Sequence, residues 1–135
     1  MEYTEIVLRG RIPSKKNSKQ VICFGKVPRL IPSAKHKEWH TEASVALQNQ
    51  KPITKVGSIV FILYAPDNRK GDLSNKWESV ADLLVDLEII EDDNWFVMQD
   101  VRMVFGGVDK ENPRAVVRVY PQFDIGKLLD YNGDV

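Results

Sequence analysis

The apolar segment from Gly57 to Ala65 constrains the fold more than any other part of the chain. It reads GSIVFILYA and contains no charged residue. A segment this apolar is stable in water only when other parts of the protein cover it. We therefore expect a central strand over Val56 to Ala65, buried on both faces. Its nine residues are far fewer than the roughly 20 that a membrane-spanning helix needs. We therefore expect no association with a membrane.

Hydrophobic periodicity on both sides of this segment predicts the remaining elements. They are a strand in residues 3–12, a hairpin with arms Val21–Phe24 and Val27–Ile31, helices over Ala34–Gln50 and Leu73–Leu87, and strands over Val97–Phe105 and Ala115–Tyr120. The side chains expected to face inward are Ile6 and Leu8; Trp39, Ala43, Ala46 and Leu47; Leu73, Trp77, Val80, Leu84 and Leu87; and Val101, Met103 and Phe105. Gly106-Gly107 and Asn112-Pro113 are expected to bracket a turn. This order predicts a mixed α/β (α+β) fold, in which two main helices pack on one face of a central mixed sheet.

The length of 135 residues fits a single domain. We assign it to residues 1–120, with residues 121–135 as a C-terminal tail or a short docked helix. A composition of 43% hydrophobic and 28% charged residues excludes a largely disordered chain. The acidic N-terminus is not that of a signal peptide, and the single cysteine, Cys23, cannot form an internal disulfide or a thiolate zinc site. These features favour a cytoplasmic protein.

Charge is divided between the two halves of the chain. Residues 1–70 carry a net charge of +8 and residues 71–135 a net charge of −8. The segment from Arg9 to Lys37, called the basic segment below, holds nine basic residues and no acidic one. A solvated surface usually carries both signs, so this segment indicates an anionic partner, most simply nucleic acid.

Several familiar sites are excluded by their missing motifs. The chain has no Gly-rich phosphate loop, no G-x-S-x-G elbow and no C-x-x-C pair. His36 and His40 are four residues apart, but Lys37 stands where a zincin motif requires glutamate.

The acidic half instead offers carboxylates at two places. Asp72 stands at the start of the second helix, and Asp92-Asp93 follows it in a loop. Taken alone, the first would be a helix N-cap and the second a solvated loop. Beside a basic segment, they have the layout of a metal nuclease, in which carboxylates hold Mg²⁺ at a phosphodiester and the ion offsets their mutual repulsion.

These residues resemble the RusA-like crossover-junction endodeoxyribonucleases. The family pattern is roughly D-L-D-N-x-x-K, then a helical D-A-L, then a D-D pair before a strand. The matching positions are Asp72, Asn75, Asp82, Asp92 and Asp93, and Pro13 to Asn17 is similar to the family's first loop. The likeness covers about residues 6–120.

Two positions depart from the family pattern. Ser74 stands in place of the second aspartate, and Glu78 in place of the lysine, while Lys76 lies two residues earlier. We expect a rearranged site in which Glu78 takes over metal ligation and Lys76 lies near phosphate. The alternative is an inactive member of the family.

The resemblance implies a Mg²⁺-dependent endonuclease that resolves four-way (Holliday) DNA junctions in recombination and repair, acts as a homodimer and is commonly prophage-encoded. Mn²⁺ is an alternative ion. The expected catalytic residues are Asp72, Asp93, Glu78 and Lys76, and the expected metal ligands are Asp72, Asp93, Glu78 and Asp92. The expected DNA-binding residues are Arg11, Lys15, Lys16, Asn17, Lys19, Lys26, Arg29, Lys35, Lys37, Arg69 and Lys70.

Two other functions stay open at this point. One is a DNA-binding protein of the same fold without catalysis, and the other is an interaction protein whose opposite charges serve self-association. A further question is how Asp72 and Asp93 meet, because the helix between them spans about 22 Å. Either the helix ends early, near Leu84, and residues 85–93 run back along it, or Asp93 comes from the partner subunit of a dimer.

Overall fold

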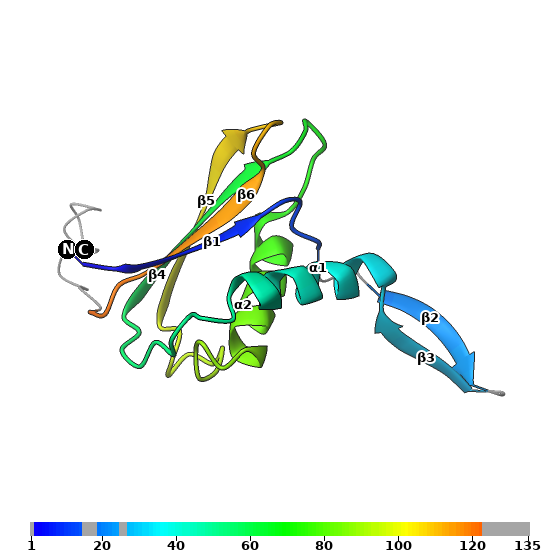
Figure 1. The fold of residues 1–135 in the computed structure, drawn as a ribbon, viewed down its shortest axis with the longest axis horizontal. Helices are drawn as coiled ribbons and strands as arrows, with labels where there is room; N and C mark the ends of the chain where they lie inside the picture. The colour runs from blue at the N-terminus through cyan, green and yellow to red at the C-terminus, as the bar shows by residue number, and fades with distance from the viewer. Residues whose placement is uncertain (1, 15–18, 25–26, 123–135) are drawn as a thin grey trace, which may run out of the picture.

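The structure is a computed structural model that describes residues 2–14, 19–24 and 27–122, with only the backbone described for residues 19–24 and 27–32 (Figure 1). The elements follow the predicted order. They are β1 (Thr4–Arg9), β2 (Lys19–Phe24), β3 (Val27–Pro32), α1 (Ala34–Ala46), β4 (Ser58–Ala65), α2 (Leu73–Asp86), β5 (Asp100–Val108) and β6 (Arg114–Val119). The predicted tail 121–135 lies almost wholly outside the described residues.

The sheet is mixed, as the sequence predicts. Its four strands lie in the order β1-β6-β4-β5, with β5 parallel to β4 and the other pairs antiparallel. Strands β2 and β3 form a separate antiparallel hairpin that extends away from the rest of the molecule (Figure 1). Among the described residues, no helix is long and apolar enough to cross a membrane.

One face of the sheet carries the core. Register aligns Ile6 with Val117 and Val117 with Phe61, so these three side chains share a face. All three are at most 2% exposed, and they pack in one cluster with Trp39 of α1 and Trp77 of α2. Both helices therefore cover the same face, as Figure 1 shows.

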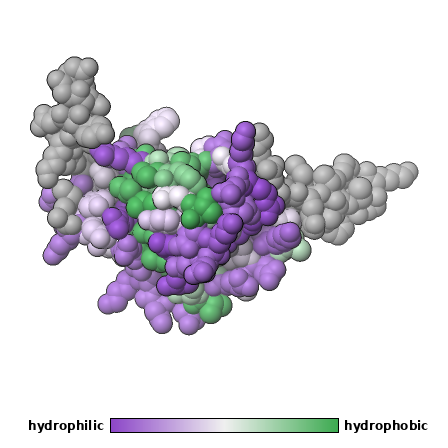
Figure 2. All heavy atoms as spheres, turned by 90° about the horizontal axis from the view of Figure 1, so that it is seen from above, coloured by the Kyte–Doolittle hydropathy of each residue, from purple (hydrophilic) through white to green (hydrophobic). Residues whose placement is uncertain are grey.

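Strand β4 is central but not buried on both faces. Ile59, Phe61 and Leu63 are buried on the helix-covered face, whereas Val60 and Ile62 on the opposite face are only partly buried. The expectation of two covered faces is wrong because the helices pack on one side alone. Figure 2 shows apolar residues gathered on one face of the molecule, with hydrophilic residues around them.

The two helices end close to where the periodicity predicts. In α1, Ser33 is the N-cap, and its hydroxyl oxygen accepts a hydrogen bond from the His36 N–H. Trp39 and Ala43 are buried and Leu47 is partly buried, but Ala46 is exposed, contrary to expectation. Helix α1 is tied to the end of α2 by a contact of 3.2 Å between His40 Nε2 and Asp86 Oδ2.

Strand β5 differs most from its prediction. It begins at Asp100 rather than Val97 and runs through the glycine pair, which forms a bulge where Tyr64 pairs with Gly107 instead of Gly106. Gly106 needs to be glycine because a Cβ there would lie 2.6 Å from the Tyr64 ring. Met103 and Phe105 share the helix-covered face by register, yet they are 38% and 54% exposed. The burial expected for them is wrong because β5 is an edge strand that the helices do not cover along its whole length.

Candidate functional site on helix α2

The four expected catalytic residues lie in two pockets. Asp72 and Lys76 line one pocket, and Glu78 and Asp93 line the other. Lys76 and Glu78 are two residues apart on α2, so they point about 160° apart around an axis that turns about 100° per residue. The rearranged site expected from the sequence is therefore divided between two sides of the helix.

The pocket lined by Glu78 and Asp93, called the acidic pocket below, contains carboxylates from two segments of the chain. Glu78 and Asp82 come from α2, and Asp93 comes from the loop before β5. The pocket has a volume of about 160 Å³, and its other lining residues are Trp77, Ala81, Met98 and Val101. Glu78 and Asp93 are exposed and Asp82 is partly buried. The sequence matches Asp82 to the helical aspartate of the family pattern, but the expected site residues do not include it.

A reversal of the chain after α2 brings Asp93 to this pocket. Leu87 is the C-cap, and Glu88 has a left-handed backbone with φ 58°. The N–H groups of Ile89 and Ile90 donate to the carbonyl of Leu84 at 2.9 and 3.2 Å, and both side chains are buried. Asp93 thus returns to the helix of its own chain. The chain turns back as in the first of the two arrangements, but α2 runs to Asp86 instead of ending near Leu84, and the return reaches Glu78 and Asp82 rather than Asp72.

The Asp92-Asp93-Asn94 turn holds the returning loop in a fixed shape. Asp92 accepts hydrogen bonds from the Asp93 N–H at 2.7 Å and from the Asn94 side-chain amide at 2.9 Å. These bonds, the backbone one first, lower the pKa of Asp92. Asn94 Oδ1 in turn accepts from the N–H of Phe96 at 2.9 Å. Asp92 does not line the acidic pocket, and its carboxylate serves the turn.

The donor set of the acidic pocket suits a hard divalent cation. Mg²⁺ takes oxygen ligands and is usually held by one or two carboxylates, with waters and substrate phosphate completing its shell. Glu78, Asp82 and Asp93 supply such oxygens. Across residues 2–14, 19–24 and 27–122, no three His, Cys, Asp or Glu side chains are close enough together to hold a metal ion by themselves. The residues fit an ion that the protein and its substrate hold jointly.

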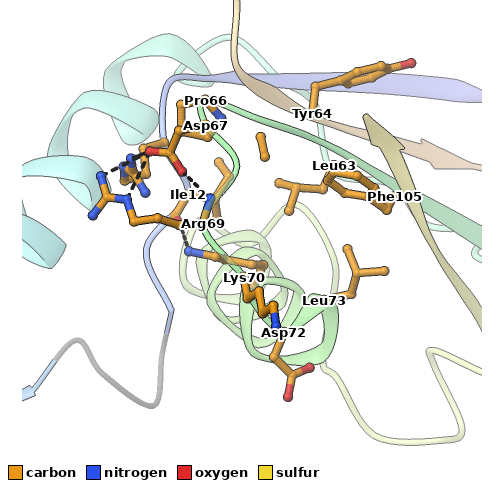
Figure 3. A pocket seen from close by; sticks show the side chains of 14 residues that line it. Ile12, Leu63, Tyr64, Pro66, Asp67, Arg69, Lys70, Asp72, Leu73 and Phe105 are labelled. Atoms are coloured by element: carbon orange, nitrogen blue, oxygen red, sulfur yellow. Dashed lines mark hydrogen bonds and ion pairs between the residues drawn. The ribbon is translucent and has the colours of Figure 1, made fainter. Parts of the chain in front are cut away.

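Asp72, the expected first ligand, caps helix α2. Its Oδ1 accepts hydrogen bonds from the Ser74 N–H at 3.0 Å and from the Ser74 hydroxyl at 2.7 Å. The residue that departs from the family pattern, Ser74, thus binds the aspartate that the pattern retains. Asp72 lies at the edge of the first pocket, and Figure 3 shows its carboxylate directed away from Asp67.

The first pocket, called the basic pocket below, is larger and has an apolar interior. Its volume is about 560 Å³, and Ile12, Leu63, Leu73 and Phe105 line it (Figure 3). Its charged lining residues are Arg11, Arg69, Lys70, Lys76, Asp67 and Asp72. It lies where β4 ends and α2 begins, and the N-terminus of a helix favours anions.

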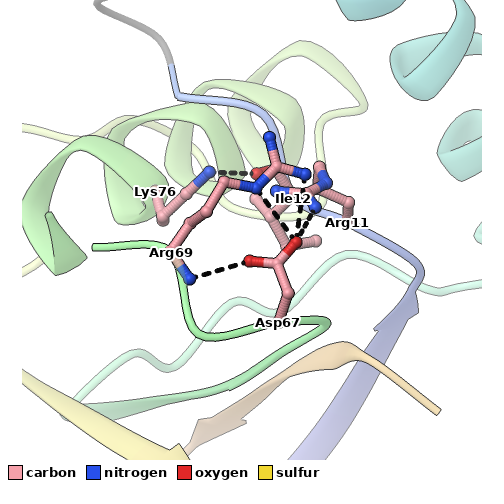
Figure 4. A network of polar contacts seen from close by, with 5 residues as sticks. All are labelled: Arg11, Ile12, Asp67, Arg69 and Lys76. Atoms are coloured by element: carbon pink, nitrogen blue, oxygen red, sulfur yellow. Dashed lines mark hydrogen bonds and ion pairs between the residues drawn. The ribbon is translucent and has the colours of Figure 1, made fainter. Parts of the chain in front are cut away.

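Asp67 organises the arginines of the basic pocket (Figure 4). It forms ion pairs with Arg11 and with Arg69, and its Oδ1 accepts the Arg69 N–H at 3.0 Å. That backbone hydrogen bond and then the Arg11 side chain lower the pKa of Asp67 from 3.8 to about 2. Sequence reasoning missed this residue, although an Asp two positions before the N–H that it binds is typical of an Asx-turn.

Lys76 is committed to the same region. Its Nζ donates to the backbone carbonyl of Ile12 at 2.6 Å, which ties α2 to the segment after β1 (Figure 4). Burial and then the neighbouring Arg11 lower the pKa of Lys76, whereas Asp67 raises it. An anion bound beside Lys76 would favour its charged form.

The remaining expected DNA-binding residues are only partly described. Lys35 and Lys37 are exposed in the first turn of α1, and Lys70 is exposed beside the basic pocket. Lys15, Lys16, Asn17 and Lys26 lie outside the described residues, as do the side chains of Lys19 and Arg29.

Comparison with known proteins adds no family assignment. No protein-family model matches the sequence, and no curated protein matches it significantly. The resemblance to the RusA-like nucleases is carried by the motif residues alone.

Proposed function

We propose that this protein is a Mg²⁺-dependent endodeoxyribonuclease of the RusA-like family that cuts four-way DNA junctions. The observation that carries the proposal is the acidic pocket, in which Asp93 from a loop lies with Glu78 and Asp82 from α2. Carboxylates repel one another, and a cation held jointly with the substrate would offset the repulsion among those that line this pocket. The rearranged site then uses Glu78 where the family pattern has lysine.

The protein's own residues divide the work in this proposal. Glu78, Asp82 and Asp93, which line the same pocket, would hold the ion. When bound, Mg²⁺ supplies charge that polarises a phosphoryl oxygen and stabilises the leaving oxygen. The basic segment would hold the phosphate backbone, and the fixed turn at Asn94 would keep Asp93 in position.

The proposal includes a homodimer that acts on branched DNA in the cytoplasm. A four-way junction has two cleavable strands related by symmetry, which suits a two-fold enzyme. Strand β5 is an edge strand, and outside the basic pocket it has three exposed apolar side chains, namely Met103, Val104 and Val108. An exposed apolar edge is a template for pairing with another chain, and a second copy is the partner we propose.

A DNA-binding protein without catalysis is the second candidate. Two observations favour it: Asp72 is engaged as a helix cap by Ser74, and Lys76 donates to the Ile12 carbonyl. Asp72, which matches the family pattern, and Lys76, which is an expected catalytic residue, would then serve structure rather than chemistry.

Nicking of a synthetic four-way junction, with and without Mg²⁺, separates these functions. We expect strand cleavage near the junction only with Mg²⁺ or Mn²⁺, and binding of the junction without either ion. Binding without cleavage under all ionic conditions would favour the second candidate, and absence of binding would contradict both.

The DNA-binding part can be tested through the basic segment. Replacing Lys15, Lys16 and Lys19 together by alanine should lower the slope of log affinity against log salt by about 0.9 for each phosphate that the variant no longer neutralises. Lys110→Ala, which removes an exposed lysine far from the segment in sequence, is the control. An unchanged affinity and slope in the triple variant would show that DNA binds elsewhere.

A further inference from the structure

The basic pocket is larger than phosphate binding requires. Backbone phosphates are bound by exposed cations on open surfaces. This pocket has a volume of about 560 Å³ and an interior of Ile12, Leu63, Leu73 and Phe105. That size lies within the range of small-molecule sites, which combine an apolar interior with a few polar groups. Its occupant should therefore have an apolar or planar part as well as a negative charge.

We propose that the basic pocket binds one unpaired nucleotide of a DNA strand, with the base inside and the phosphate at the cationic edge. The inference rests on the proposed action on DNA and goes beyond it, because it assigns a substrate feature to a second pocket. A base within a duplex is stacked on both sides and must be extruded from the stack before it can enter a pocket. A base that is already unpaired enters at the least cost, and it is therefore the ligand that we assign to this pocket.

Phe105 supports the base-binding role. Its side chain lines the pocket and is 54% exposed, on a strand whose register directs it toward α2. Bases stack readily on exposed aromatic rings, with little dependence on sequence. Leu63 and Leu73 lie near Phe105, so the base would pack against an aromatic ring and aliphatic side chains (Figure 3).

The charged edge supports the phosphate-binding role. Four cations and two carboxylates line the pocket, which leaves an excess of positive charge. Asp67 holds the guanidinium groups of Arg11 and Arg69 in place, so they are ordered before a ligand arrives (Figure 4). Each guanidinium has five N–H donors, more than Asp67 accepts, and a phosphate can take the others.

A bulged duplex separates base binding from phosphate binding. Affinity is measured for a duplex with a one-nucleotide adenine bulge and for the same duplex with an abasic bulge, which keeps the phosphate and lacks the base. We expect the wild type to bind the adenine bulge roughly tenfold more tightly, as stacking on an aromatic side chain implies. Equal affinities would overturn the inference.

Two pairs of variants then locate the effect. Phe105→Ala should abolish the preference for the base, whereas Met103→Ala should keep it, because Met103 lies on the same face of β5 but outside the pocket. Lys70→Ala should lower the salt slope by about 1, whereas Lys110→Ala should not. A base preference that survives Phe105→Ala would place the base elsewhere and overturn the inference.

A free nucleotide has the same base and phosphate as a nucleotide of DNA, so the binding of dAMP is measured separately. Tighter binding of dAMP than of the adenine bulge, measured by calorimetry, would assign the pocket to free nucleotides and overturn its assignment to DNA. Junction nicking is measured on the same proteins. Base preference without nicking leaves the inference standing and contradicts the nuclease, whereas nicking without base preference contradicts the inference alone.

Discussion

The basic pocket and the acidic pocket share helix α2 and differ in charge, size and lining. The basic pocket lies at the first turn of the helix, where the N-terminus and Arg11, Arg69, Lys70 and Lys76 favour an anion. The acidic pocket lies one to two turns later on another side, where Glu78, Asp82 and Asp93 favour a cation. One helix thus separates a surface suited to holding DNA from a surface suited to holding the metal. If the proposed function is correct, the scissile phosphate must lie near the second surface.

The largest loss of junction nicking should follow a substitution in the acidic pocket. Asp93→Asn removes a charge that we propose the ion needs, and the electrostatic contribution of such an ion is several kcal/mol. We expect junction nicking to fall by about 100-fold or more, with DNA binding unchanged or tighter because a repulsive charge is removed. Glu91→Gln, which removes an exposed carboxylate of the same loop outside the acidic pocket, is the control and should retain more activity. Equal losses in the two variants would contradict the division between them.

Asp72→Asn tests whether the two pockets act separately. Asparagine caps helices about as well as aspartate, so this change removes the charge and preserves the cap that binds Ser74. The sequence alone predicts abolished cleavage, whereas the separate pockets predict a loss of less than about tenfold. Thermal denaturation checks that the fold is intact. A loss as large as that of Asp93→Asn would show that both pockets contribute to one catalytic centre.

The ion pairs of Asp67 in the basic pocket should make the stability of the protein depend on pH. The pKa of Asp67 is about 2 in the folded protein, below its usual value of 3.8. Its contribution to stability is therefore fully present above about pH 4 and is lost as the pH falls toward 2. Asp67→Asn should lower the melting temperature at pH 6, by no more than a few degrees because the pair faces water. The difference from wild type should disappear as the pH falls below about 2, and a difference that is constant with pH would contradict the ion pairs.

Most of the fold can be predicted from the sequence because it depends on local periodicity. Alternation identifies the buried Ile6 and Leu8, and helical spacing identifies Trp77, Val80 and Leu84. The exposure of β5 cannot be predicted in this way, since it depends on which strand lies at the edge of the sheet. Local patterns carry no information on that order.

The candidate site is predicted less well, because the segment after α2 is too short to return to the start of the helix. Helix α2 has 14 residues and so spans about 21 Å, while the six steps from Leu87 to Asp93 extend at most about 20 Å. Burial of Ile89 and Ile90 uses part of that reach. Asp93 therefore returns only to the level of Glu78 and Asp82, and Asp72 remains beside the other pocket. Of the two partners of Asp67, Arg11 is distant in the sequence and Arg69 lies in the same loop. No periodic pattern in the sequence therefore indicates these ion pairs.

The smallest expected effect is a change in the free energy of unfolding caused by a substitution at Glu88. This residue lies in the chain reversal that brings Asp93 to the acidic pocket. Glu88 has a left-handed backbone with φ 58°, at the position after the C-cap that glycine usually occupies. A side chain in this conformation costs about 1–2 kcal/mol, and glycine avoids that cost but loses more entropy on folding. Glu88→Gly should thus raise the free energy of unfolding by about 0.5–1 kcal/mol. Glu88→Ala removes the same charge and keeps Cβ, so it should give no increase. Urea denaturation compares the two variants, and equal stability in both would show that the turn is not strained at this residue.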